Sequence, residues 1–308
     1  MSNLAHLLAI SGLHMGLLTG FVFVSVRVGL SLIPPVALRL PVRKIAAILA
    51  LLSAAGYLAL SGGSVATERA FVMVSVMFVA VLIDRRAISM RAVAVAALVV
   101  LVLRPESLLS PGFQMSFAAT TALVAVFGVF RDVGIRFGPG WLRAIATVAL
   151  SSAIAGLATA PFGAAHFNAI AHYGLLANLL CVPVMGSVVI PAAVVAVLLA
   201  PFGLEWIGLQ VMGFGLSWIL LVAEWVASFD GSQGFVASPP FFVLPALSLG
   251  ALWVVLWQGP VRWIGIVPLA VSLTFWGYQD RPQVLISENG GLVGVMTGQG
   301  RGPEQRQR

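Results

Sequence analysis

The sequence predicts an all-α polytopic membrane protein: a bundle of about ten transmembrane helices, some of them broken or kinked, with a short β-like C-terminal tail. Of its 308 residues, 60% are hydrophobic and 9% are charged, whereas an ordinary soluble domain has about 25% charged residues. The mean hydropathy is +1.05. Apolar runs of the length that crosses a bilayer, about 20 residues, recur along nearly the whole chain.

The candidate spans are the apolar runs between short polar loops. The seventh contains Pro183, Gly186 and Pro191, so we expect that helix to be broken or kinked, with its freed backbone groups facing protein or water. The spans lie near residues 5–33, 44–60, 65–83, 88–103, 110–130, 142–160, 174–200, 205–228, 241–257 and 261–277.

Basic residues gather in alternate loops, which accounts for the formal net charge of +7 without a nucleic-acid-binding surface. Because Lys and Arg mark the cytoplasmic side, this pattern predicts an extracytoplasmic N-terminus and, with an even number of spans, a C-terminus on the same side. The basic loops are 34–44, 84–91 and 131–143, whereas 61–64 and 161–173 have no Lys or Arg and 104–109 has Arg104 beside Glu106.

The C-terminal segment differs in character from the rest. Residues 282–298, "PQVLISENGGLVGVMTG", alternate like two short strands around a turn. We therefore expect a transmembrane channel-type domain over residues 1–278, the start of a truncated β-rich extracytoplasmic domain over 279–298, and a disordered tail over 299–308.

The first span carries a polar island. Gly12, Gly16 and Gly20 recur every four residues, so on a helix they form a stripe that lets a neighbouring helix approach closely. His14 lies about 200° from Gly12, and Ser11 shares its side. This side either presents a functional imidazole or holds a structural histidine bonded to another helix. A helix broken at Ser11–Gly12 is the third alternative.

The third span begins with two charges, Glu68 and Arg69. Charges within a membrane usually face an interior or water-filled cavity. Adjacent helical residues point about 100° apart, so we expect each to find its own partner on another helix or water at the outer mouth. Arg69 suits a phosphate because a guanidinium matches phosphate oxygens bidentately. The alternative is a pair that snorkels at the membrane boundary.

The fifth span begins at an N-cap serine, Ser110, followed by Pro111 at the first helical position. Gln114 then lies about one turn below the outer surface, and Ser116 belongs to a separate polar strip. The amide of Gln114 either lines a passage or bonds a neighbouring helix.

The region between the sixth and seventh spans holds His166, Asn168, His172 and Asn178. Two histidines six residues apart with no carboxylate nearby are a weak metal signal, so we expect no metal site and no cofactor. No soluble-enzyme motif is present in the sequence, so we expect no catalytic residues.

The predicted topology places His14, Arg69, Gln114 and His166 toward the same, outer end of the bundle. That shared level makes them candidates for one site.

Four sequence blocks resemble the signature blocks of the ComEC competence family, in the family's order and at its spacing. They are "HLLAISGLHMG" (6–16), "GGSVATERAFVM" (62–73), "SPGFQMSFAA" (110–119) and "GLLANLLCVPVMG" (174–186), and the resemblance extends over residues 4–290. It implies a channel in the bacterial inner membrane for the uptake of single-stranded DNA during natural transformation. The matching residues are Ser11, Gly12, His14, Gly16, Arg69, Gln114, Ser116 and Asn178.

The resemblance also implies partners: single-stranded DNA, the lipid bilayer and other competence proteins, including a cytoplasmic ATPase. It leaves a homo-oligomer open. Family members commonly carry an OB-like domain before the first block and a β-lactamase-like domain after the bundle. Here the first block begins almost at Met1, and residues 282–295 resemble only the opening strands of the second domain. We therefore expect a truncated gene product, a fragment or a reduced member, without the family's nuclease activity. The alternatives are a small-molecule transporter, an intramembrane enzyme that uses His14 with Glu68 or Ser11, and a non-functional remnant.

Overall fold

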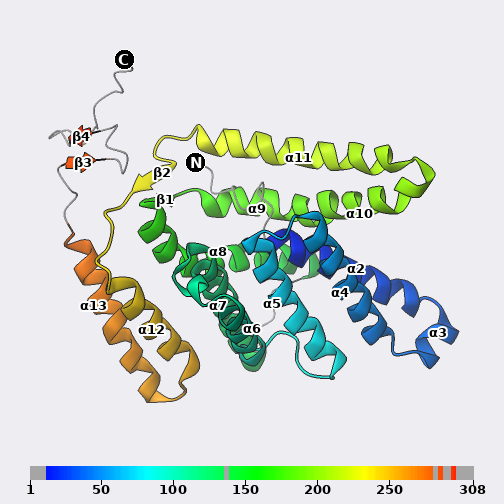
Figure 1. The fold of residues 1–308 in the computed structure, drawn as a ribbon, viewed down its shortest axis with the longest axis horizontal. Helices are drawn as coiled ribbons and strands as arrows, with labels where there is room; N and C mark the ends of the chain where they lie inside the picture. The colour runs from blue at the N-terminus through cyan, green and yellow to red at the C-terminus, as the bar shows by residue number, and fades with distance from the viewer. Residues whose placement is uncertain (1–11, 135–138, 280–283, 287–292, 296–308) are drawn as a thin grey trace. The chain divides into compact units, whose positions relative to one another are not determined.

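Helices dominate the computed structural model, which describes residues 12–134, 139–279, 284–286 and 293–295 (Figure 1). Within these residues, eight helices are long and apolar enough to cross a membrane. Two shorter apolar helices, Met90–Leu103 and Val243–Leu256, lie where further spans are predicted. The predicted all-α membrane fold is therefore confirmed.

The chain divides into two compact units, residues 1–235 and 236–308. The predicted domain boundaries at residues 278 and 298 remain predictions. The helices of the first unit are α2 (Gly12–Ser31), α3 (Pro34–Arg39), α4 (Val42–Leu60), α5 (Val65–Leu82), α6 (Met90–Leu103), η1 (Pro105–Leu109), α7 (Pro111–Val133), α8 (Gly140–Phe167), α9 (Gly174–Val184), η2 (Met185–Val189), α10 (Ile190–Leu199), η3 (Ala200–Phe202) and α11 (Glu205–Ala227).

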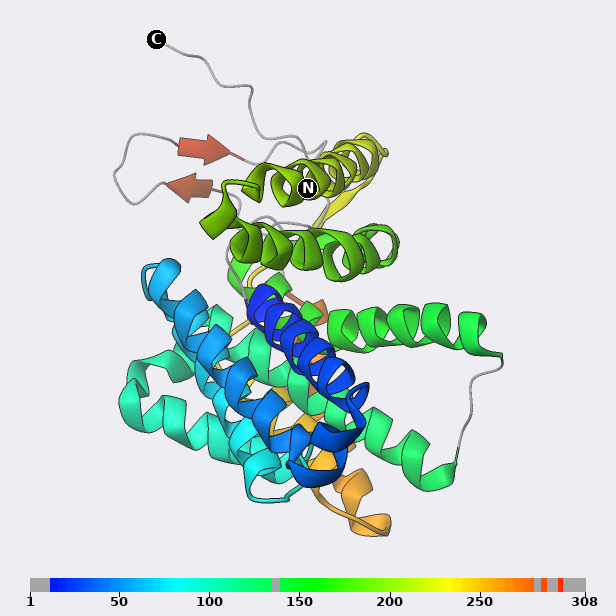
Figure 2. The same cartoon turned by 90° about the vertical axis from the view of Figure 1, so that its right-hand side faces the viewer.

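Helix α2 lies between two hydrophobic cores of the first unit (Figure 2). Its Met15 is fully buried against α4 and α5. On another side, Leu17 and Leu18 pack against the core formed by α9, η2 and α11. A third core joins α6 to Phe113 and Phe117 of α7. Helix α2 therefore connects the two groups of helices that surround it.

The seventh predicted span is one continuous helical run rather than two separate pieces. Pro183 lies inside α9, and the helix then widens to a π-helix over Met185–Val189 before α10 begins. A proline has no N–H to donate, and beyond Pro183 the Ile190 N–H donates to the Met185 carbonyl, five residues earlier. The prolines therefore do not break the helix. Its hydrogen bonds change from an i−4 to an i−5 pattern over the π-helical segment.

The sixth span is longer than its sequence pattern suggests. Helix α8 continues through Pro161 to Phe167, whereas the sequence predicts a loop from residue 161. An interior proline is tolerated in membrane helices because neighbouring groups satisfy the freed carbonyl. The helix ends at Asn168, whose φ of 53° is left-handed. His166 consequently lies on the last helical turn and not in a loop.

Two contacts relate the ends of the helices in the first unit. At the start of α4 and the end of α5, Lys44 Nζ bonds Asp84 Oδ2 at 2.7 Å. Beyond α8, the strand β1 (Ala169–Ala171) pairs antiparallel with β2 (Gln233–Phe235), which follows α11. The loops after α8 and α11 therefore meet at one end, as the predicted alternation of loops requires.

The second unit is a helical hairpin followed by two short strands. Helix α12 (Val243–Leu256) packs against η4 (Pro260–Gly265) and α13 (Ile266–Gly277). Gly250 and Gly265 allow this contact, because a Cβ at either would lie within 2.8 Å of the other's carbonyl oxygen. Strands β3 (Val284–Ile286) and β4 (Val293–Val295) pair antiparallel. This confirms the predicted hairpin strands, while the predicted turn lies outside the described residues.

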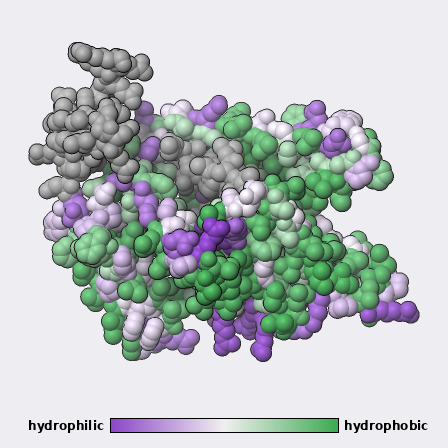
Figure 3. Space-filling model, viewed as in Figure 1, coloured by the Kyte–Doolittle hydropathy of each residue, from purple (hydrophilic) through white to green (hydrophobic). Residues whose placement is uncertain are grey.

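The outer surfaces of the helices are apolar, as Figure 3 shows for one face of the molecule. Leu52, Val102 and Leu157 are 62%, 81% and 77% exposed. A soluble monomer rarely exposes apolar patches this extensive, whereas lipid solvates them. The surface agrees with a multi-pass membrane protein.

Helices α10 and α11 pack with their backbones in contact at Gly208. A Cβ at this position would lie 2.6 Å from the Ala192 carbonyl oxygen and 2.6 Å from the Ala196 nitrogen. Backbone atoms cannot yield without moving the helix, so we expect Gly208→Ala to lower the unfolding free energy by about 1–3 kcal/mol. Unfolding in mixed detergent micelles, followed by circular dichroism, measures this change.

The matched control is Gly213→Ala on the same helix, where nothing lies within 4 Å of the added Cβ. It should be neutral or stabilising by up to about 1 kcal/mol, since alanine favours a helix over glycine. Equal stabilities for the two variants would contradict the close α10–α11 packing.

Candidate functional site

The starts of α2, α5 and α7 and the end of α8 meet at one end of the first unit. A Cβ at Gly12 of α2 would lie 3.3 Å from Ala70 Cβ of α5, and one at Gly112 of α7 would lie 2.8 Å from Nη2 of Arg69. His166 of α8 bonds Gln114 of α7. These contacts bring together the ends of the helices that carry His14, Arg69, Gln114 and His166. We call this region the polar end.

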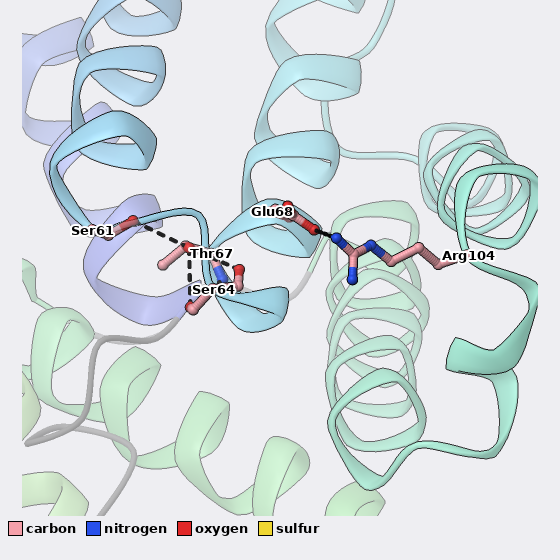
Figure 4. Close-up of polar contacts among 5 residues, drawn as sticks. All are labelled: Ser61, Ser64, Thr67, Glu68 and Arg104. Carbon is pink, nitrogen blue, oxygen red and sulfur yellow. Dashed lines mark hydrogen bonds and ion pairs between the residues drawn. The ribbon is translucent and has the colours of Figure 1, made fainter.

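The α4–α5 turn is fixed by a network of hydroxyl groups (Figure 4). Ser64 is the N-cap of α5, and its Oγ accepts from the Thr67 N–H at 3.3 Å. The fully buried Thr67 hydroxyl donates to the Ser64 carbonyl at 2.9 Å and accepts from Ser61 Oγ at 3.2 Å. This arrangement holds the first turn of α5, and hence Glu68 and Arg69, in a defined orientation.

Glu68 forms an ion pair with Arg104, whose Nη2 lies 2.7 Å from Glu68 Oε2 (Figure 4). Glu68 lies in the first turn of α5 and Arg104 directly follows the last residue of α6. Both helix dipoles favour these charges. The structure thus gives Glu68 its own partner on another helix. Sequence reasoning treats Arg104 only as a loop charge, and no spacing rule joins residues 68 and 104.

Arg69 occupies a very different electrostatic setting. Its guanidinium is half-buried and lies over Gly112 in the first turn of α7. It makes no ion pair or hydrogen bond with the residues that the structure describes. The start of a helix carries a partial positive charge, so this guanidinium faces a region that repels it.

Gln114 connects three segments of the polar end. Its Nε2 donates to the Leu108 carbonyl at 3.1 Å, and its Oε1 lies 2.8 Å from His166 Nε2. Because Oε1 can only accept, His166 Nε2 carries the proton in this arrangement. Gln114 therefore joins η1, α7 and α8 and fixes the orientation of the imidazole.

A small cavity adjoins the ion pair. It has a volume of about 40 Å³ and is lined by Val65, Glu68, Arg69, Arg104, Ser107 and neighbouring apolar residues. A water molecule needs roughly 10–15 Å³ of such space, so the cavity has room for a few waters but not for a nucleotide. The charged groups of Glu68, Arg69 and Arg104 can therefore contact water in a cavity whose other lining residues are mostly apolar.

The other predicted site residues lie in varied settings. Asn178 is on α9, and its Oδ1 is buried without a hydrogen-bond partner among the described residues. Ser116 and His14 are partly buried. Ser11 lies outside the described residues. The functional roles of all these residues stay predictions.

The predicted glycine stripe packs at only one of its positions. Gly12 lies against α5, but nothing lies within 4 Å of a Cβ at Gly16 or Gly20. His172 belongs to a different contact, in which its Nδ1 lies 2.7 Å from the Gly231 carbonyl and its ring covers Gly234 of β2. That histidine therefore supports the pairing of β1 with β2.

The chemistry of the polar end suits the binding of an anion. It combines two guanidinium groups, a carboxylate, an amide and an imidazole at a helix start. Among the described residues, no group of three His, Cys, Asp or Glu side chains is placed to hold a metal ion.

Comparison with known proteins relates the sequence of this chain to one family. The sequence model of the family described as "Competence protein" matches residues 1–261. "ComE operon protein 3" from Bacillus subtilis strain 168 is 31% identical over 245 residues, which cover 77% of this chain and 28% of that protein. The chain thus spans less than a third of that relative's length. No solved structure matches the chain.

The Gln114–His166 contact can be tested by a double-mutant cycle. We expect Gln114→Ala and His166→Ala to be non-additive in unfolding free energy by about 1 kcal/mol, because either change alone removes the same hydrogen bond. Denaturation in mixed micelles measures the cycle. Pairing His166→Ala with Gln210→Ala on the exposed face of α11 is the control, and it should be additive. Additivity in both cycles would contradict the contact.

Proposed function

The chain belongs to the competence protein family, and from this premise we propose that it forms a membrane passage for single-stranded DNA taken up in natural transformation. A polyanion crosses a bilayer only along a path that is wet and lined with polar groups. The polar end supplies such groups beside lipid-facing helices. We assign the entry of the DNA to this end and the lipid contact to the apolar outer surfaces.

The observation that carries the proposal is the position of Arg69. A guanidinium and a helix start repel each other, and the Gly112 N–H in the first turn of α7 has no partner among the described residues. A phosphate bound beside both groups accepts hydrogen bonds from each and neutralises both charges. Because Arg69 is half-buried, this contact gains strength from its partial removal from water.

The polar end suits conduction rather than tight binding. A permeant must leave as well as enter, so weak contacts at several sites serve a passage better than one strong site. Glu68 neutralises Arg104, which leaves Arg69 as the unpaired cation among the described residues lining the cavity. Gln114 and His166 offer amide and imidazole groups that can contact bases regardless of sequence.

The basic loops at the opposite end support an orientation for this passage. Lys44, Arg85 and Arg86 lie at that end, and basic residues mark the cytoplasmic side. We therefore propose that the polar end faces outward in the bacterial inner membrane. On this view a cytoplasmic ATPase and other competence proteins act from the basic end, and this chain has no catalytic role.

The proposal is tested by Arg69→Gln. We expect this variant to bind oligo-dT about tenfold more weakly, since one charged hydrogen-bonded contact contributes about 1.4 kcal/mol. The salt dependence of log K should become shallower by about 0.7, the value for one phosphate of a single strand. Fluorescence anisotropy of the purified chain in nanodiscs measures both.

A second variant, Gly112→Ala, moves the Arg69 guanidinium without removing it. The new Cβ would lie 2.8 Å from the end of that flexible side chain, which can swing away at little cost in stability. We expect weaker DNA binding with unchanged folding. Gly16→Ala, which has nothing within 4 Å, is the control. Unchanged affinity in both Arg69→Gln and Gly112→Ala would refute the proposed contact.

A further inference from the structure

A second arginine lies at the polar end, and its guanidinium is already occupied. Arg104 contacts Glu68 at 2.7 Å, and the two side chains are 43% and 36% exposed. The pair is therefore neither sealed in the interior nor fully solvated. Both side chains line the same small cavity as Arg69. The cavity wall thus holds two guanidinium groups with one carboxylate.

A carboxylate and a phosphate are equivalent partners for a guanidinium, since both present paired oxygens to its planar fork. The Glu68 carboxylate accordingly occupies the place on Arg104 that a phosphate oxygen would take. A cavity of about 40 Å³ is too small to admit a nucleotide beside the intact pair. A phosphate takes this place on Nη2 of Arg104 only when the Glu68 carboxylate moves away.

The pair can exchange partners because of how it is held. Thr67, beside Glu68, is locked by the hydroxyl network of the α4–α5 turn, so the helix keeps its place when the side chain turns. The exposed part of Arg104 stays in water, and a half-exposed ion pair contributes only about 0–1 kcal/mol. Little free energy is therefore needed to open it.

We propose that Arg104 is a second phosphate-binding arginine of the passage and that Glu68 is a built-in competitor that limits its affinity for the DNA backbone. This inference rests on the proposed function. A passing phosphate displaces the carboxylate from Arg104, and the carboxylate returns when the phosphate leaves. The competition keeps two neighbouring arginines from holding the strand tightly, as conduction requires.

The test compares oligo-dT binding by Glu68→Gln, Arg104→Gln and the double variant in nanodiscs. Freeing Arg104 in Glu68→Gln should raise the affinity about fivefold and steepen the salt dependence of log K by about 0.7. The double variant should lose this gain and bind no better than the unmodified chain. Glu106→Gln, at an exposed acid two residues beyond Arg104, controls for the change in net charge.

Each outcome separates this inference from the proposed function. If Glu68→Gln binds no better than Glu106→Gln, or if the double variant keeps the gain, Glu68 does not compete with phosphate at Arg104. A purely structural ion pair would show a lower melting temperature for Glu68→Gln with no gain in binding. If Arg69→Gln in the same assay still loses affinity, the proposed passage stands while this inference falls.

Discussion

Polar groups inside a bilayer must find their partners within the protein, and this constraint governs the structure. Many of the hydroxyl side chains in the helices meet it locally. Thr19, Thr120 and Thr159 donate to carbonyls four residues earlier on their own helices. Charged groups cannot be satisfied in this way. They gather at helix ends, where Glu68 pairs with Arg104 and Lys44 with Asp84.

Within the polar end, Arg69 departs from this rule. Its neighbours have partners: Glu68 has Arg104, and Gln114 has both Leu108 and His166. A cation against a helix start adds to the cost of leaving water. Such a cost persists at sites where a ligand removes it. The position of Arg69 at the start of α7 therefore agrees with the phosphate contact that we propose for it.

Much of the fold follows from the sequence, because membrane helices are set by length and hydropathy alone. Every described long helix corresponds to a predicted span. The sequence-based predictions are wrong at prolines, because a proline can either end a helix or lie inside one. Pro161 and Pro183 predict a helix end or a helix break, but both lie inside helices. Neighbouring groups in a membrane bundle can satisfy the carbonyl that a proline leaves without a donor.

The site is less predictable than the fold. The shared level of Arg69, Gln114 and His166 follows from the alternation of spans. The Glu68–Arg104 pair and the approach of Arg69 to Gly112 depend on which helices are neighbours, and hydropathy carries no information about that. The four sequence blocks indicate the family, yet they do not include Arg104.

The proposed passage requires that the DNA backbone contact the polar end and not merely the most basic surface. Photo-crosslinking from either end of α5 tests it directly, with a crosslinker at Val65 or at Ile83, which are 47% and 63% exposed. At about 0.15 M salt, we expect a labelled single strand to crosslink at Val65 and to be displaced by unlabelled strand. Crosslinking at Ile83, among screened basic residues, should fade as salt rises. Crosslinks at Ile83 with none at Val65, at every salt concentration, would contradict DNA entry at the polar end.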